Sequence, residues 1–176
     1  RFLAHLLNRN IKVRFSEKDF TIGGINYSAG TLVITKAGNP SLEALPALAQ
    51  KMGIGLVKVP TGFVEKGADF GSDKLRYIRR PKVGLLAGPG AYSLNVGEIW
   101  HFFEQQVEYP VTVLNTSSLY TQSWKELDVL ILPAGNYAAL NDKAVLERLK
   151  DWVSNGGKLI AVGEVVDQLA KAEWGF

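Results

Sequence analysis

Glu164 has the sequence position best suited to chemistry. It follows the apolar run KLIAVG (158–163) and precedes a helical pattern over 165–170. A sharp turn from a buried strand into a helix is the geometry of a nucleophile elbow, because it exposes one side chain beside free helix amides. A carboxylate is a poor nucleophile towards an acyl group. We therefore expect Glu164 to cap the helix and accept hydrogen bonds from those amides.

Two further polar side chains lie on a predicted helix over 95–107. Glu98 follows Asn95 by three positions, which is the spacing of a capping box, so we interpret it as a cap in preference to a group facing a cleft. His101 lies next to the apolar stripe, where a histidine is more often a surface or hydrogen-bonded residue than a catalyst. The stripe itself consists of Val96, Ile99, Phe103 and Val107.

A glycine-rich stretch, GLLAGPGAYS (84–93), leaves a predicted strand and enters that helix. Its pattern Gly88-x-Gly90-x-x-Ser93 lacks the third Gly or Ala of a dinucleotide fingerprint. The next strand ends at Asn115, where a dinucleotide-binding fold would place an acidic residue for the ribose. The pattern thus favours a tight turn in which glycines relieve backbone strain over a nicotinamide site.

Composition excludes several classes of site. The 176 residues contain no cysteine, so disulfides, thiolate metal sites and a cysteine nucleophile are ruled out. Only two histidines are present, His5 and His101, too few for a multi-histidine zinc centre. We therefore expect no catalytic residue, no metal and no cofactor in this chain.

Charge and hydropathy restrict the partners. Twenty basic and 17 acidic residues give a net charge of +3, too balanced for a nucleic-acid binder. The densest basic cluster reads as a solvated connector rather than a phosphate site; it comprises Lys74, Arg76, Arg79, Arg80 and Lys82. No apolar run approaches the roughly 18 residues of a membrane span. We expect neither a nucleic acid nor a membrane as partner.

Alternating apolar runs and helical stripes indicate the fold of residues 81–176. Strands are predicted over 82–87, 111–114, 128–132 and 158–162. Between the last two lies a helical stripe capped by Asn141 or Asp142 and stopped by Asn155-Gly156-Gly157. Strand, helix and strand in so few residues require a parallel crossover. The pattern predicts a doubly wound α/β domain with a flavodoxin-like or Rossmann-like parallel sheet.

Residues 1–70 predict a smaller α/β lobe. The pattern indicates a helix end over 2–7, a strand over 11–15, a hairpin around Gly23-Gly24, and a strand over 31–35. A helix from Asn39-Pro40 to Met52, kinked or delayed by Pro46, and a strand over 54–59 complete a second strand–helix–strand unit. The glycine-punctuated, charged stretch over 60–81 reads as a long connector, with the domain boundary at 71–80.

Both chain ends fall inside apolar patterns. The chain begins at Arg1 within a helical stripe and stops at Phe176 without a turn or tail. We expect it to be a piece of a longer polypeptide, truncated within the C-terminal domain, and its compartment is not readable from its first residues.

Four segments of 81–176 resemble the class I glutamine amidotransferase-like superfamily: PKVGLLAGPG, GEIWHFFEQQ, DVLILPAGNY and LKDWVSNGGKLIAVGE. In active members the turn after the strand of the last segment carries a cysteine nucleophile activated by histidine. Here Glu164, or a neighbour within one position, stands at that turn, and no histidine follows it. The resemblance implies the family's fold and a degenerate nucleophile position at Glu164.

A narrower resemblance covers nearly the whole chain. FTIGGINYSAGTLVI, GADFGSDKL, PKVGLLAG and GEIWHFFEQ are similar to the C-terminal region of large bacterial zinc carboxypeptidase-like proteins of the carboxypeptidase A type. In those proteins the metallopeptidase domain lies upstream. Neither histidine here is followed by a glutamate three positions later, so the family's His-x-x-Glu zinc motif has no counterpart. The resemblance implies a zinc peptidase in the parent polypeptide, and a secreted or periplasmic location.

Two classes of function follow. The first is a non-catalytic accessory domain that docks on the upstream peptidase domain, binds a peptide or small ligand, or mediates assembly. The second is an independent hydrolase or lyase that uses Glu164, Glu98 and His101. The missing nucleophile chemistry favours the first. If the family fold holds, we expect a crevice at the carboxyl ends of the strands beside Glu164, lined by Tyr92, Ser93, Glu98, Gly135, Asn136 and Tyr137.

Overall fold

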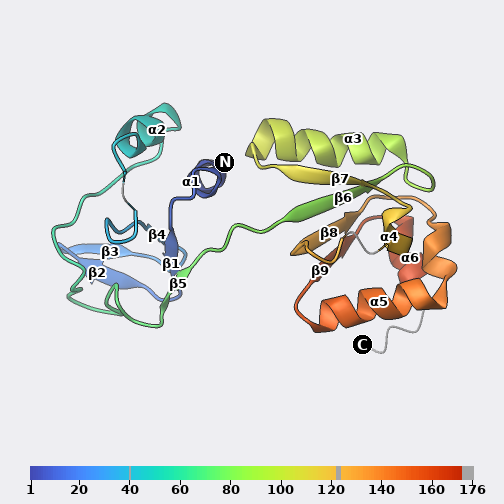
Figure 1. Cartoon of the computed structure of the whole chain (residues 1–176). Coiled ribbons are helices and arrows are strands. Elements are labelled where there is room, and N and C mark those ends of the chain that lie inside the picture. Colours follow the sequence, from blue (N-terminus) through green and yellow to red (C-terminus); the bar gives the residue numbers. More distant parts are fainter. Residues whose placement is uncertain (40, 122–123, 172–176) are drawn as a thin grey trace. The chain divides into compact units, whose positions relative to one another are not determined.

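The chain forms two compact units, Arg1–Arg80 and Pro81–Phe176, in a computed structural model that describes residues 1–39, 41–121 and 124–171 (Figure 1). No helix in the described ranges is both long and apolar enough to cross a membrane.

A four-stranded parallel sheet forms the centre of the second unit. Its strands are β6 (Val83–Ala87), β7 (Val111–Asn115), β8 (Val129–Leu132) and β9 (Lys158–Ala161), in the order β7-β6-β8-β9. All three pairings are parallel, with Val83 opposite both Val111 and Val129. This confirms the four predicted strands and the parallel pairing of the last two.

Helices cover both faces of this sheet. On one face lies α3 (Ser93–His101), which continues as the π-helix η1 (Phe102–Val107), and on the other lies α5 (Lys143–Ser154) (Figure 1). Asp142 caps α5 by accepting a hydrogen bond from the amide of Ala144 at 2.8 Å, as its position predicts. Shorter helical segments follow three of the strands: α4 (Ser118–Thr121), η2 (Ala138–Asn141) and α6 (Glu164–Ala170).

The main core of the second unit lies between the sheet and α5. Its centre is Trp124, which is fully buried and packs edge-to-face on Trp152 with ring centroids 5.6 Å apart. A loop with a partly buried Trp124 is what the sequence of residues 119–126 favours, but α4 extends to Thr121 and the Trp124 side chain is fully buried. Residues 122–123 lie outside the described residues. Buried residues of α4, β6, β8, η2, α5 and α6 complete the cluster: Leu86, Leu119, Leu130, Leu132, Tyr137, Ala139, Leu140, Val145, Leu149 and Val165.

The first unit consists of short antiparallel strands and two seven-residue helices, α1 (Phe2–Asn8) and α2 (Leu45–Lys51). Strand β1 (Arg14–Ser16) pairs with β4 (Leu32–Val33) on one side and with β5 (Leu75–Tyr77) on the other. The predicted hairpin is confirmed as β2 (Phe20–Ile22) and β3 (Ile25–Tyr27). A small core lies under it: Phe20, Ile22, Val33, Val64 and Leu75.

The predicted strand–helix–strand unit in this half is wrong. Residues 54–59 form no strand, and Val57 in that run is 59% exposed. Strand β5 instead lies in the stretch predicted as a connector. The sequence did not predict this strand because three residues are too few to show an alternation of apolar and polar side chains. The predicted helix begins at Leu45, with Pro46 in its first turn, which confirms the delayed start that Pro46 predicted. Pro40, where the prediction placed the cap, lies outside the described residues. The side chain of Asn39 bonds both the N–H and the C=O of Lys12, at 2.7 and 3.0 Å.

Candidate functional site

The turn from β9 into α6 is centred on Gly163. Its backbone has φ +65° and ψ −137°, a conformation that L-residues rarely adopt. Glu164 follows as the first residue of α6, exposed to solvent, and no side chain caps that helix. The predicted helix cap at Glu164 is therefore wrong. Gly163, which has no side chain, occupies the strained position of the turn, one residue before Glu164.

Close packing explains why glycine occupies this position. A Cβ at Gly163 would lie 2.9 Å from the Cβ of Ala134, just beyond the end of β8. The turn therefore contacts the adjacent strand end and leaves little room for a side chain at the point where an elbow presents its nucleophile. Gly163, between Val162 and Glu164, was the sequence signal for this tight turn, because a positive φ favours glycine.

Two loops meet where the crevice was expected, at the carboxyl ends of β6 and β8. The amide of Tyr92 donates to the carbonyl of Ala134 at 2.9 Å, and the amide of Asn136 donates to that of Gly90 at 2.8 Å. Ala91 and Gly135 form an isolated antiparallel bridge between these bonds. Any Cβ at Gly135 would collide with the carbonyl oxygen of Gly90. The predicted neighbours do come together, but through backbone pairing.

The residues predicted to line the crevice differ in exposure. Tyr92, Ser93 and Asn136 are exposed, whereas Gly135 and Tyr137 are buried. The Tyr137 hydroxyl donates to the carbonyl of Pro133 at 2.8 Å, and burial raises the pKa of Tyr137 to about 12. Tyr137 is thus a core residue that fixes its loop.

The side chain of Gln168 holds the same loop against α6. Its Oε1 accepts from the Tyr137 amide at 3.1 Å, and its Nε2 donates to the Tyr137 carbonyl at 2.8 Å. Both backbone groups of this buried residue are therefore satisfied, which stabilises the contact between the β8 loop and α6.

Glu98 and His101 lie on α3 and are exposed. The capping box predicted for Glu98 is wrong because α3 starts at Ser93, two residues before Asn95. The Asn95 side chain instead donates to the Glu98 carboxylate at 3.3 Å. Among the described residues, no hydrogen bond or ion pair joins Glu164 to Glu98 or His101.

The glycine-rich stretch after β6 forms a tight turn, as predicted. Gly88 and Gly90 have φ of +104° and +92°, and the Ala91 amide donates to the Gly88 carbonyl at 3.1 Å. A Cβ at Gly88 would lie 2.9 Å from the Nδ2 of Asn115, so glycine allows close approach to the neighbouring strand end. This is the backbone role that the pattern favoured over dinucleotide binding.

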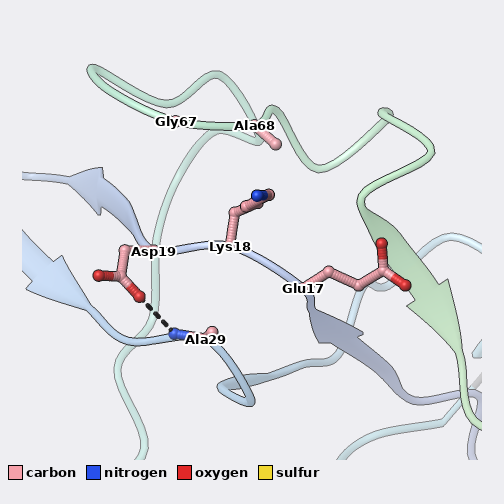
Figure 2. A pocket seen from close by; sticks show the side chains of 6 residues that line it. All are labelled: Glu17, Lys18, Asp19, Ala29, Gly67 and Ala68. Atoms are coloured by element: carbon pink, nitrogen blue, oxygen red, sulfur yellow. Dashed lines mark hydrogen bonds between the residues drawn. The ribbon is translucent and has the colours of Figure 1, made fainter.

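Two surface cavities lie away from these strand ends. The first, about 600 Å³ in the first unit, is lined by Glu17, Lys18, Asp19, Ala29, Gly67 and Ala68 (Figure 2). Its carboxylates are engaged, because Glu17 pairs with Arg76 at 2.8 Å and Asp19 accepts from the Ala29 amide at 2.8 Å. The exposed Lys18 side chain extends across it (Figure 2).

The second cavity, about 360 Å³, lies beside η1 and the start of β7. Its lining is Trp100, Glu104, Glu108, Tyr109, Pro110 and Val111. The sequence analysis predicts neither cavity, although Trp100 and Glu104 are four positions apart in the predicted helix and so were a signal of an aromatic and acidic patch on its surface. The described parts of the chain contain no group of three or more His, Cys, Asp or Glu side chains that could hold a metal ion.

The fold defines an α/β protein whose parallel sheet is compatible with a flavodoxin-like or Rossmann-like arrangement. The sequence matches no family model, and no curated protein or solved structure is significantly similar to it. Membership of the amidotransferase-like superfamily, and a carboxypeptidase parent, stay predictions from the sequence motifs.

Proposed function

We propose that this chain is a non-catalytic module of a larger polypeptide, in which residues 81–176 have an amidotransferase-like fold without that family's chemistry. The observation that carries the proposal is the glycine at the elbow. Acyl transfer by a nucleophile elbow needs a side chain at the strained turn, beside free helix amides and within reach of a base. Gly163 provides none, and Ala134 occupies the adjacent space.

The surroundings of the turn support the same proposal. A backbone bridge between Ala91 and Gly135 lies at the strand ends, where open α/β sheets bind ligands. Glu164 is one position beyond the strained residue and has no histidine partner among the described hydrogen bonds and ion pairs. In this proposal any peptidase activity, and the zinc it requires, belongs to the upstream domain implied by the carboxypeptidase resemblance. This module docks on that domain or mediates assembly of the parent protein.

Hydrolysis assays test this proposal. The purified chain should turn over neither glutamine, nor p-nitrophenyl acetate, nor peptides with free C-termini, with or without added zinc. The alternative function, a hydrolase or lyase that uses Glu164, is favoured by the exposure of this carboxylate beside the turn. Turnover that survives repurification and is lost in Glu164→Gln, but not in Glu147→Gln, an exposed carboxylate on α5, would establish the alternative and overturn our proposal.

A further inference from the structure

The cavity beside η1 combines an exposed indole with two carboxylates. We call it the η1 groove; it is lined by Trp100, Glu104, Glu108, Tyr109, Pro110 and Val111. Trp100 is 47% exposed, so its indole is accessible from solvent. At about 360 Å³ the groove is large enough for a long side chain, and its volume falls within the range of small-ligand sites.

The end of η1 that forms the groove is held in place by hydrogen bonds. The Tyr109 amide donates to the carbonyl of Phe103 at 2.9 Å, and the Tyr109 hydroxyl donates to that of Pro81 at 2.6 Å. Glu108 closes the helix in the left-handed conformation, with φ +56° and ψ +45°. Tyr109 is buried, so these bonds fix the floor of the groove. A π-helix is rare and often occurs at functional sites.

The chemistry of the lining selects a cation. Carboxylates of Glu104 and Glu108 flank the groove, and no lysine or arginine contributes to its lining. The face of an indole attracts a lysine ammonium or an arginine guanidinium. Nearby carboxylates also attract such a cation, so the two effects add. A ligand with a long stem and a positive end fits the groove.

The adjoining edge of the sheet selects a polypeptide. Strand β7 is at the edge, and the Thr116 amide donates to the Ala87 carbonyl at 2.9 Å. The backbone of Thr116 thus faces β6, and in a parallel strand every second residue directs its backbone groups to the same side. Val111 and Val113 are an odd number of positions from Thr116, so their backbone N–H and C=O groups point away from β6. Val113 is 51% exposed. An apolar edge with outward backbone groups is a template for an added strand.

We propose that the η1 groove and the β7 edge together bind an extended polypeptide segment that carries lysine or arginine. The segment adds to β7 as a strand, and one of its basic side chains lies against Trp100 and Glu104. Backbone pairing supplies affinity, and the groove selects the cation. This inference goes beyond the proposed function and does not depend on it, since groove and edge would bind such a segment whatever the elbow does.

Titration with synthetic peptides tests the inference. The probe is an acetylated and amidated hexapeptide that alternates valine with lysine, added to the ¹⁵N-labelled chain. We expect amide shifts at Val111 and Val113 and at the Trp100 indole, and binding at least about tenfold tighter than that of the matched valine–glutamate peptide. Equal binding of the two peptides, binding of neither, or shifts elsewhere would overturn the inference. Equally tight binding of free lysine or choline would show a small-cation site and refute the strand.

Variants locate the binding energy. Trp100→Ala should weaken binding of the lysine peptide about two- to fivefold, and Trp100→Phe less, because a smaller ring keeps part of the cation–π attraction. Glu104→Gln should weaken it about twofold. Glu98→Gln is the matched control, an exposed carboxylate on α3 that is not part of the groove lining, and should leave binding unchanged. If Glu98→Gln weakens binding as much as Glu104→Gln does, only general surface charge acts and the groove has no role.

Discussion

The two units of this chain are stabilised in different ways. The second is organised by a parallel sheet with a contiguous cluster of eleven buried residues on one side. The first has strands of two or three residues and a cluster of five buried residues at the hairpin. Further buried apolar side chains lie on and near its two helices: Ala4, Leu6, Leu7, Val13 and Ala49. The buried apolar area of the first unit is therefore spread over several short elements, whereas in the second unit one sheet organises it. Loops join these short elements of the first unit, and polar contacts order those loops.

Side-chain-to-backbone hydrogen bonds supply that order. Asn39 joins the segment after β4 to Lys12, and Asp69 accepts from the Val64 amide at 2.8 Å. Arg14 donates to the carbonyl of Phe70, and its guanidinium lies 4.3 Å from the ring centroid of Tyr77. Such contacts depend on single residues and leave no periodic pattern. Hydrophobic periodicity in a sequence therefore predicts which residues are buried, but it does not predict hydrogen bonds that single polar side chains make to the backbone.

The largest effect is expected from the core of the second unit. Trp124→Ala should lower that unit's free energy of unfolding by about 3–5 kcal/mol, because it removes the fully buried ring that packs on Trp152. Its Nε1 has no hydrogen-bond partner, so truncation leaves no polar group newly unpaired. Hydrogen exchange should show the loss of protection in β6 and β8.

The counterpart in the first unit is Phe20→Ala. Phe20 stacks on Tyr27 and meets Phe70 edge-on, with centroids 5.1 and 5.6 Å away. If the units are independent, this variant exposes β1 and β5 amides to exchange, while Trp124→Ala does not. Uniform loss of protection through both units with either variant would show one cooperative unit and break the comparison.

A smaller effect is expected at the elbow. Gly163→Ala should cost about 1–3 kcal/mol, because an L-residue is strained at its φ and the new Cβ would crowd Ala134. Gly23→Ala in the first unit is the matched control: its φ is +59°, but nothing lies within 4 Å of the new Cβ, so it has the backbone strain alone. Adding Ala134→Gly should partly rescue Gly163→Ala; additive costs would contradict the packing account.

The Tyr137 hydroxyl should contribute about 1 kcal/mol, since Tyr137→Phe removes its bond to the Pro133 carbonyl. Burial raises the pKa of Tyr137 from 10.0 to about 12. Because the folded-state pKa exceeds the unfolded value, the contribution of this group is complete below about pH 10 and is lost as pH rises towards 12. The difference in denaturation midpoint between wild type and variant should shrink over that range. A constant difference would contradict the pKa shift.

The sequence predicted what long periodic patterns encode: the four parallel strands, the helix α3, a cap on α5 at Asn141 or Asp142, and the β2–β3 hairpin. The predicted inward stripe of α3 is only partly buried. It missed β5 because three residues show no alternation, and it placed a strand at 54–59 because an apolar run does not reveal whether a partner strand exists. It identified the two loops of the candidate site but not their backbone bridge, since hydrogen bonds between loops depend on dihedral angles that the glycines permit without specifying.

The smallest effect concerns Glu164, for which the sequence predicted a helix cap. The structure shows no side-chain cap on α6, so Glu164→Ala should cost only about 0.3–1 kcal/mol, the value of a carboxylate near the positive end of a helix dipole. Asp142→Ala is the control, because Asp142 does cap α5 and its loss should cost about 0.5–2 kcal/mol. The two losses should also differ in salt dependence: an exposed dipole interaction is screened at 0.5 M salt, whereas a capping hydrogen bond largely persists. Thermal melts of both variants at low and high salt measure the difference. If Glu164→Ala lowers stability as much as Asp142→Ala does, and equally at low and high salt, Glu164 caps α6 after all.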